Sequence, residues 1–432
     1  MKQRGRHRRQ KRGRALRAFL AGTALALTAA ATMISASQAT VGDRPGALKA
    51  LAASERTTGL RLQERLVPRS TLDRLAAAMG RPVGVSTVLD DADHSLLGAA
   101  DCTTSERTAL PVAPAATRAY CWDAADTRGW RAGAVTTSGD ADDDGHWGEH
   151  RVIVSGWTHQ AGRSAKPGLA RVAFVDANDL THLRYASALL VVPVDGGRDY
   201  RALTSRLSGM VWYQDKLLVT AADGLYVYDM NRVQRATVDS AAVGRVPDGW
   251  SAHGQRFVLP AVGSYRLTGA GSAPHLGGIS LDRSTAPDSL VASERTAVDS
   301  DRPARLWRYD FSKDPARPGL LATGATGSAR AVEAYETDAS GIEGVLSYRA
   351  GGADRAGWYV GRAPARTDRH GSLWRQDTDG AEATRCGTEG APRCWGVGAG
   401  SLSYWEATGE VWSQSGRMLF AMPLTSIDRA LD

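Results

Sequence analysis

The stretch "GMVWYQDKLLVTAADGLYVYDM" (Gly209 to Met230) decides the fold. It opens on a glycine and holds three short runs of apolar, β-branched and aromatic residues, which two polar or glycine-containing turns separate. The stretch "GSLSYWEATGEVWSQSGRMLFAMP" (Gly400 to Pro423) repeats the same order of glycine, strand, turn, strand, turn and strand. This recurrence indicates a repeated β-meander.

Looser copies of the unit begin at three further glycines, so that five copies cover the chain from about Trp130 onward. The opening glycines lie 56 to 76 residues apart and are Gly133, Gly209, Gly278, Gly344 and Gly400. A single meander cannot bury both faces, and radial stacking of meanders gives a β-propeller. We therefore predict an all-β fold, a β-propeller of five blades. Six blades are possible if the long first units conceal another, and a β-sandwich pair is the structural alternative.

The last copy is short, which bears on how the ring closes. From Gly400 to the end there are only about 33 residues, enough for three strands. The fourth strand must come from elsewhere, and the natural donor is the segment just before the first copy, "ALPVAPAATRAYCW" (109–122). We expect the two ends of the repeat region to pair.

The N-terminus has the composition of a secretory signal peptide. Nine positive charges and no acid in the first eighteen residues precede an apolar run and the small residues "SASQA", ending at Ala39. We predict a signal peptide at 1–39, a short, helical, partly ordered extension at 40–110, and the propeller at 111–432. A retained membrane anchor is the alternative for the apolar run. The Arg8-Arg9 pair leaves the twin-arginine export route open, but the general secretory route is favoured.

Removing residues 1–39 changes the charge balance. The chain has 53 Lys and Arg against 46 Asp and Glu, and the leader takes nine of the basic residues with it, which leaves 44 against 46. The basic character therefore belongs to the leader and gives no reason to expect nucleic acid as a partner.

Four cysteines in an exported chain indicate two disulfides. The local pairing joins Cys102 to Cys121 and Cys386 to Cys394, and it needs the least rearrangement of the chain. The spacings match no zinc-binding pattern.

The units at Gly209–Met230 and Gly400–Pro423, together with the Arg- and Ala-rich leader, resemble a group of secreted actinobacterial proteins typical of Streptomyces. The resemblance runs from about Trp130 to the C-terminus and implies an extracellular, propeller-like protein of unassigned function. Members of that group often carry a His before the glycines of the second unit, where this chain has Arg206 and Leu207.

The segment "SGDADDDGHWGEHRVIVSG" (Ser138 to Gly156) contains two metal-site patterns. Asp140, Asp142 and Asp144 alternate and precede a glycine, as in calcium loops, so a structural calcium ion is one interpretation of this turn, and no other cofactor is expected. A solvated acidic hairpin turn is the competing interpretation and the favoured one. The pattern H-x-x-E-H (146–150) would need a helix to bring its histidines together, but glycines interrupt it and a strand follows.

The repeat also suggests where a ligand could bind. In a propeller the first strand of each blade lines the central channel, and aromatic residues with a few acids there suit a sugar or a small polar molecule. Filling of space between blades is the alternative role for these aromatics. The candidate ligand-binding residues are Trp212, Tyr213, Asp282, Glu343, Tyr348, Tyr404 and Trp405.

No nucleophile motif is present in the sequence, so we expect a secreted, non-catalytic binding protein. Its ligand would be a glycan, a cell-wall fragment or an extracellular partner protein, and it would meet a membrane only through its uncleaved leader. Two alternatives remain. One is a calcium-dependent hydrolase of the lactonase kind with Asp282 and Glu343 converging on the metal, and the other is an extracellular developmental signalling factor.

Overall fold

The computed structural model describes residues 44–431, apart from 161–167, 269–273, 299, 352–355, 366–368 and 399. The chain divides into two compact units, Met1–Pro45 and Gly46–Asp432, and all described helices and strands lie in the second. The predicted signal peptide (1–39) lies outside the described residues. Within the described part, no helix is long and apolar enough to cross a bilayer.

The expectation of a mostly β protein is confirmed. Among the described residues the antiparallel pairings contain five runs of four strands, which we call meanders, and the first two runs belong to one 13-stranded sheet. The first has β6 (Trp130–Thr137), β7 (Val152–His159), β8 (Ala170–Asp176) and β9 (Arg184–Val194). The second has β11 (Met210–Tyr213), β12 (Lys216–Ala221), β13 (Gly224–Asp229) and β17 (Phe257–Leu267). The third has β18 (Leu276–Asp282), β19 (Ser289–Glu294), β20 (Ala304–Asp310) and β22 (Glu333–Thr337).

The last two meanders complete the set. The fourth has β23 (Ile342–Tyr348), β24 (Gly357–Arg362), β25 (Ser372–Gln376) and β26 (Ala381–Ala383). The fifth has β27 (Ser403–Trp405), β28 (Glu410–Ser415), β29 (Met418–Pro423) and β5 (Arg118–Cys121). The helix α7 (Leu424–Arg429) follows β29. Each inner strand, β6, β11, β18, β23 or β27, begins at or near one of the opening glycines.

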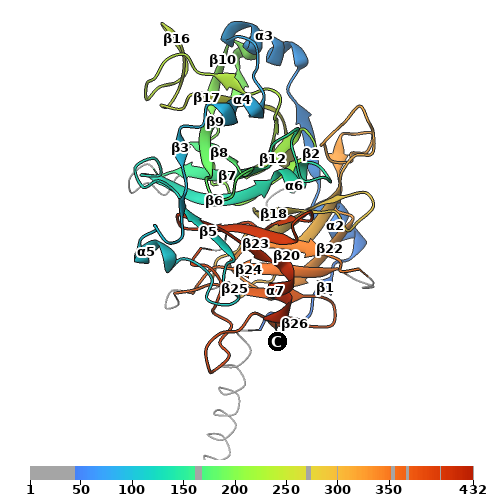
Figure 1. Cartoon of the computed structure of the whole chain (residues 1–432). Helices are drawn as coiled ribbons and strands as arrows, with labels where there is room; N and C mark the ends of the chain where they lie inside the picture. Colours follow the sequence, from blue (N-terminus) through green and yellow to red (C-terminus); the bar gives the residue numbers. More distant parts are fainter. Residues whose placement is uncertain are drawn as a thin grey trace, which may run out of the picture. The chain divides into compact units, whose positions relative to one another are not determined.

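The first two meanders are joined through the long strand β17. Its residues 257–260 pair in parallel with β9, and its later residues pair with β13. On the inner side, the backbone N–H of Trp212 in β11 donates to Thr136 Oγ1 in β6 at 2.9 Å. The result is a nearly closed, barrel-like sheet (Figure 1). Buried side chains such as Val154, Phe174 and Leu259 pack together in one hydrophobic cluster of this sheet.

Shorter elements connect or extend the second half of this sheet. They are η1 (Asp195–Gly197), β10 (Asp199–Ala202), β14 (Gln234–Arg235), β15 (Val243–Val246) and β16 (Gly249–Ala252). They form an elaboration on the outer edge of β9 and β17, with the rings of Tyr200 and Trp250 stacked 5.4 Å apart.

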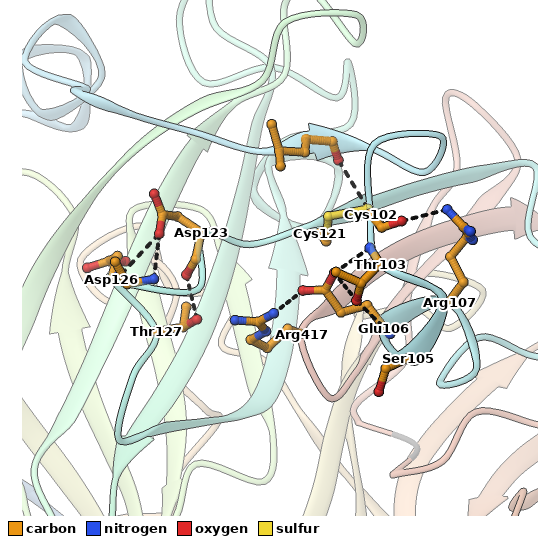
Figure 2. Close-up of polar contacts among 12 residues, drawn as sticks. Cys102, Thr103, Ser105, Glu106, Arg107, Cys121, Asp123, Asp126, Thr127 and Arg417 are labelled. Carbon is orange, nitrogen blue, oxygen red and sulfur yellow. Dashed lines mark hydrogen bonds and ion pairs between the residues drawn. A yellow bond between two sulfur atoms is a disulfide. The ribbon is translucent and has the colours of Figure 1, made fainter.

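The expected pairing of the two ends of the repeat region is confirmed. Strand β5, from the segment before the first meander, pairs antiparallel with β29, with Cys121 opposite Met418. Both predicted disulfides are present, and Cys102–Cys121 anchors this donated strand. Figure 2 shows the bond beside the ion pair of Glu106, in α5 (Thr104–Arg107), with Arg417. The closing strand is therefore held by a covalent bond on one side and the β29 ladder on the other.

The residues before β5 lie along the outer edges of the meanders. Short strands from this segment pair with outer strands: β1 (Lys49–Ala50) with β22, β2 (Leu62–Leu66) with β17, β3 (His94–Ser95) with β9, and β4 (Leu97–Gly98) with β5. Its helices are α2 (Ala53–Gly59), α3 (Arg69–Met79) and α4 (Val85–Asp90), besides α5. The helical expectation holds for α3, which buries Leu72, Leu75 and Met79, whereas residues 49–50 form a strand.

A ring of close backbone contacts joins the opening glycines. A Cβ atom at Gly278 would lie 3.0 Å from the carbonyl oxygen of Glu343, one at Gly344 2.6 Å from that of Gly400, and one at Gly400 3.0 Å from that of Gly133. Real Cβ atoms essentially never approach backbone more closely than this, so a side chain would push neighbouring strands apart. The other two contacts are Gly133 with Leu207 and Gly209 with Ile279. Each meander thus opens on glycine because its first strand abuts the next one around the ring.

Candidate anion-binding site at the glycine ring

A cavity of about 300 Å³ opens at the glycine ring, and we call it the ring pocket. Residues from all five meanders or their connections line it, which follows from its position where the inner strands begin. They include Arg131, Gly133, Arg206, Ser208, Gly277, Arg295, Val298, Ile342, Glu343, Ala363, Val397 and Gly400. A second cavity of about 480 Å³ adjoins it and shares Arg206, Ser208 and Arg295 with it.

Three arginines reach the ring pocket from different parts of the chain. Arg131 lies in β6, Arg206 lies between β10 and β11, and Arg295 directly follows β19. Arg206 is partly buried, whereas Arg131 and Arg295 are exposed. Within the described part of the chain, no side-chain hydrogen bond or ion pair satisfies the guanidinium groups of Arg131 and Arg295. Their donors are therefore free to bind a ligand.

Glu343 is the single acidic residue among the described residues that line the ring pocket. Its Oε1 atom lies 3.2 Å from Nη2 of Arg206, and its side chain is 22% exposed. The Arg206–Glu343 pair spans from the second meander to the fourth. Glu343 therefore compensates one of the three positive charges and leaves the pocket electropositive.

Burial and the positive charges around the ring pocket lower the pKa of Arg206. Burial lowers the pKa of Arg206, the charges of Arg131 and Arg295 lower it further, and Glu343 opposes the shift. Like charges nearby disfavour the charged form of a group, so the charges of Arg131 and Arg295 both act on Arg206. An anion in the pocket would relieve that repulsion.

Of the seven candidate ligand-binding residues, Glu343 is the one that lines the ring pocket. Four others lie toward the opposite ends of the inner strands, roughly 13–16 Å farther along at about 3.3 Å per residue. They are Tyr213, Asp282, Tyr348 and Tyr404. The rings of Tyr348 and Tyr404 meet edge to face, with centroids 5.0 Å apart. We call this opposite end the tyrosine end.

Arg283 occupies the tyrosine end. It forms ion pairs with Asp143 and Asp288, donates to the backbone carbonyl of Asp140 at 2.9 Å, and lies 5.8 Å from the ring centroid of Tyr213. Because these partners occupy its guanidinium group, Arg283 has a structural role at this end. It ties the turn after β6 to the third meander across the end of the inner strands.

Asp282 is also committed to partners within the fold. It is buried, accepts from Arg308 at 2.9 Å and from Ser284 Oγ at 2.5 Å, and Arg308 in turn donates to Ser347 at 3.0 Å. Glu343 and Asp282 therefore lie near opposite ends of the inner strands, each bonded to its own arginine.

Trp212 and Trp405, the remaining two candidates, are buried. Trp212 is fully buried and its ring meets that of Trp147 at 5.1 Å. Trp405 is 2% exposed and lies against Gly139 and Gly145, so that no Cβ would fit at either glycine. Both indoles fill space between the first meander and its neighbours, and their part in ligand binding stays a prediction.

The acidic turn after β6 holds its three candidate calcium ligands in different surroundings. The helix α6 (Ser138–Ala141) buries Asp140, whose Oδ2 accepts from Thr136 Oγ1 at 2.6 Å and from Ser403 Oγ at 2.9 Å. Burial raises the pKa of Asp140 to about 6, and the two hydroxyl donors limit the rise. Asp142 and Asp144 are exposed.

These carboxylates do not converge. Nowhere in the described ranges do three or more His, Cys, Asp or Glu side chains form a group that could hold a metal ion. The histidines of H-x-x-E-H lie in a turn, where residues 147 and 150 form an isolated β-bridge. Calcium binding at Asp140, Asp142 and Asp144 stays a prediction.

The arginines of the ring pocket were missed at the level of sequence. One signal could have found two of them: Arg131 lies two residues before Gly133, and Arg206 three before Gly209. Their proximity to the opening glycines places them at the ring once the repeat is known. Arg295 offers no such signal, because it follows the second strand of its meander.

Comparison with known proteins gives no family for this chain. No family model matches it, and no curated protein matches it. Solved structures with partial likeness include Drosophila Plexin A in complex with Semaphorin 1b, at 8% identity and a TM-score of 0.30, over 73% of this chain and 88% of that one. A gluconolactonase from Xanthomonas campestris matches at 12% identity and a TM-score of 0.30, over 80% and 98%. The extracellular domain of a one-component system from B. thetaiotaomicron matches at 13% identity and a TM-score of 0.27, over 63% and 37%.

Proposed function

We propose that this chain is an exported, five-bladed β-propeller that binds an anionic ligand in the ring pocket and does not catalyse its conversion. Five meanders, with inner strands that begin at one closed ring of glycines, support the count of five blades. Two disulfides and the leader-like residues 1–39 support export.

The observation that carries the proposal is the charge of the ring pocket. Three arginines face one glutamate there, and two of the guanidinium groups have free donors. Guanidinium forms paired, charge-assisted hydrogen bonds with carboxylate, phosphate and sulfate groups, which suits it to recognising anions. Of the ligand classes expected from the sequence, this favours an acidic glycan or an anionic cell-wall fragment.

A metal-dependent lactonase is less well supported. Its carboxylates would have to converge on one ion, and the two candidates, Asp282 and Glu343, lie near opposite ends of the inner strands. Each already accepts from an arginine, Arg308 or Arg206. The geometry at both ends of the inner strands therefore favours ion pairing over metal coordination by these two residues.

Thermal unfolding with and without anionic ligands tests the proposal. A ligand that binds the folded state raises the melting temperature in a concentration-dependent way. We expect uronic acid oligosaccharides, sugar phosphates and cell-wall fragments to stabilise the wild-type chain, and their neutral counterparts to have no effect.

The matched variants are Arg131→Met with Arg295→Met, which removes the two free guanidinium groups, and Arg349→Met as control. Arg349 is exposed and follows β23 at the tyrosine end, away from the pocket. The double variant should lose the stabilisation and the control should keep it. Equal stabilisation of all three chains would place the anion elsewhere and refute the proposal.

A further inference from the structure

We infer that the ring pocket selects a doubly charged phosphate group, as in a phosphate monoester, and that Glu343 limits the affinity for it by occupying Arg206. The inference rests on the proposed function and adds the chemical class of the ligand and the residue that limits its affinity.

The first argument is the charge balance at the ring. Among the described residues lining the pocket, three guanidinium groups and one carboxylate leave two positive charges uncompensated. A dianion neutralises both, whereas a carboxylate or a phosphodiester neutralises one. The attraction to two nearby positive charges is larger for a dianion than for a monoanion, so the pocket should favour the dianion.

The second argument is where the free donors lie. Arg131 comes from the first meander and Arg295 from the third, so they approach the cavity from different elements. A tetrahedral phosphate has oxygens in several directions and can accept from both guanidinium groups at once, which a single planar carboxylate does less well.

Glu343 is the internal competitor in this arrangement. Its carboxylate is 3.2 Å from Arg206 and is mostly shielded from solvent, so it occupies the third arginine in the absence of ligand. Glu343 therefore lowers the positive potential of the pocket, and its removal should tighten the binding of a dianion more than that of a monoanion.

The adjoining cavity indicates what the phosphate is attached to. It has a volume of about 480 Å³, and besides Arg206 and Arg295 its lining includes the small side chains of Ser205, Ala221 and Ala222 and the imidazole of His275. A phosphate at the arginines would leave room there for a small polar body such as a sugar or polyol. We therefore assign the ligand as a phosphate monoester of that kind, with inorganic phosphate as the minimal probe.

Calorimetric titration of the full chain with inorganic phosphate, inorganic sulfate and acetate at constant ionic strength tests the charge selectivity. At about pH 8, phosphate and sulfate, both dianions, should bind roughly tenfold or more tightly than acetate. At about pH 5 phosphate is largely singly charged, because this pH lies below its second pKa, and its affinity should fall severalfold.

Sulfate stays doubly charged at both pH values and serves as the control for the protein's own titration. The charged and titratable groups facing the two cavities are Arg131, Arg206, Arg295, Glu343 and His275. If His275 dominated the pH dependence, sulfate would bind more tightly at low pH, and phosphate would follow it. A parallel response of phosphate and sulfate would overturn the dianion inference.

The variant Glu343→Gln tests the role of Glu343. It should tighten the binding of both anions and widen the ratio of phosphate to acetate affinity, because removal of one negative charge raises the positive potential in the pocket and a dianion gains more from it than a monoanion. Should this variant fold poorly, the wild-type pH comparison still decides the charge selectivity. An unchanged ratio in a folded Glu343→Gln chain would remove Glu343 from the assignment.

The outcomes separate the two proposals. If Arg131→Met with Arg295→Met abolishes anion binding but acetate matches phosphate in the wild type, the anion site stands and the dianion selectivity fails. If no anion binds the wild type at millimolar concentration, both fail. Tighter binding of glycerol phosphate or glucose 6-phosphate than of inorganic phosphate would support the monoester, and equal affinity would reduce the ligand to the free ion.

Discussion

Replacing Asp140 by Asn should change how the stability of the protein depends on pH. Asp140 is 2% exposed, and burial raises the pKa of its carboxyl from 3.8 to about 6. Folding therefore favours the protonated form, since the unfolded chain loses this proton near pH 3.8 and the folded chain keeps it until about pH 6. The wild-type free energy of unfolding carries a contribution from Asp140 that falls as pH rises through this window.

The magnitude follows from the two pKa values. Each pH unit across the window is worth 1.36 kcal/mol, so ionisation of Asp140 removes about 3 kcal/mol of stability between those limits. The variant Asp140→Asn does not titrate and keeps an oxygen that can accept from Thr136 and Ser403. Arg283 keeps its ion pairs with Asp143 and Asp288, so the substitution leaves no arginine without a charged partner.

Urea denaturation followed by tryptophan fluorescence provides the measurement. The difference in unfolding free energy, variant minus wild type, should rise by about 2–3 kcal/mol between about pH 4 and about pH 7. Any constant effect of the substitution on hydrogen bonding cancels in this comparison. Asp142→Asn removes an exposed carboxylate from the same turn and controls for the loss of one charge. A difference for Asp140→Asn that is the same at both pH values would refute the reasoning.

Three further predictions concern packing and cross-links. Gly344→Ala should lower the free energy of unfolding by about 1–3 kcal/mol, because its Cβ would meet the Gly400 carbonyl. The control Gly380→Ala lies on the same meander with nothing within 4 Å of its Cβ, and it should leave the stability unchanged. Equal urea midpoints for the two variants would contradict the ring contact. Replacing Cys102 and Cys121 together by Ser should lower the free energy of unfolding by about 3 kcal/mol, since the disulfide closes a loop of 19 residues. An unchanged urea midpoint would show that the closing strand does not depend on this disulfide. Trp212→Ala should lower the free energy of unfolding by about 3–5 kcal/mol, because removal of the buried indole leaves a cavity. A small loss of stability with a large loss of anion binding would instead favour a ligand-binding role for Trp212.

Sequence reasoning reached the parts of the fold that local pattern and repetition encode. The opening glycines, the meander order and the donation of a strand from 109–122 to the last meander all follow from one repeated unit and its missing fourth strand. The parallel pairing of β9 with β17 could not be predicted, because it joins outer strands that carry no signature of their partner. The same limit applies to β1 and β2, whose short edge pairings depend on where the chain runs after the meanders have formed.

The candidate site likewise has residues that the repeat predicted and residues that only the folded ring brings together. Assigning the aromatic candidates to the first strand of each meander placed Tyr348 and Tyr404 on inner strands, and their rings meet at the tyrosine end. It could not show that Arg283 occupies that end, since the guanidinium reaches there from the side. The cationic pocket depends on the convergence of Arg131, Arg206 and Arg295, which are far apart in sequence and meet only when the ring is closed.

The pairing of Cys121 with Met418 has a consequence for how the chain reaches its native state. A linear stack of repeats can nucleate at one end and propagate, because each unit needs only its neighbour. Here the outer strand of the last meander, β29, has no partner on its outer edge until β5, which precedes the first meander in sequence, pairs with it. The chain between β5 and β29 must therefore close as one long loop before the ring is complete. Loop-closure entropy and high contact order make such a step slow. The disulfide between Cys102 and Cys121 restricts the conformations of the segment that carries the donated strand before closure. We expect ring closure to be the last and rate-limiting event of folding.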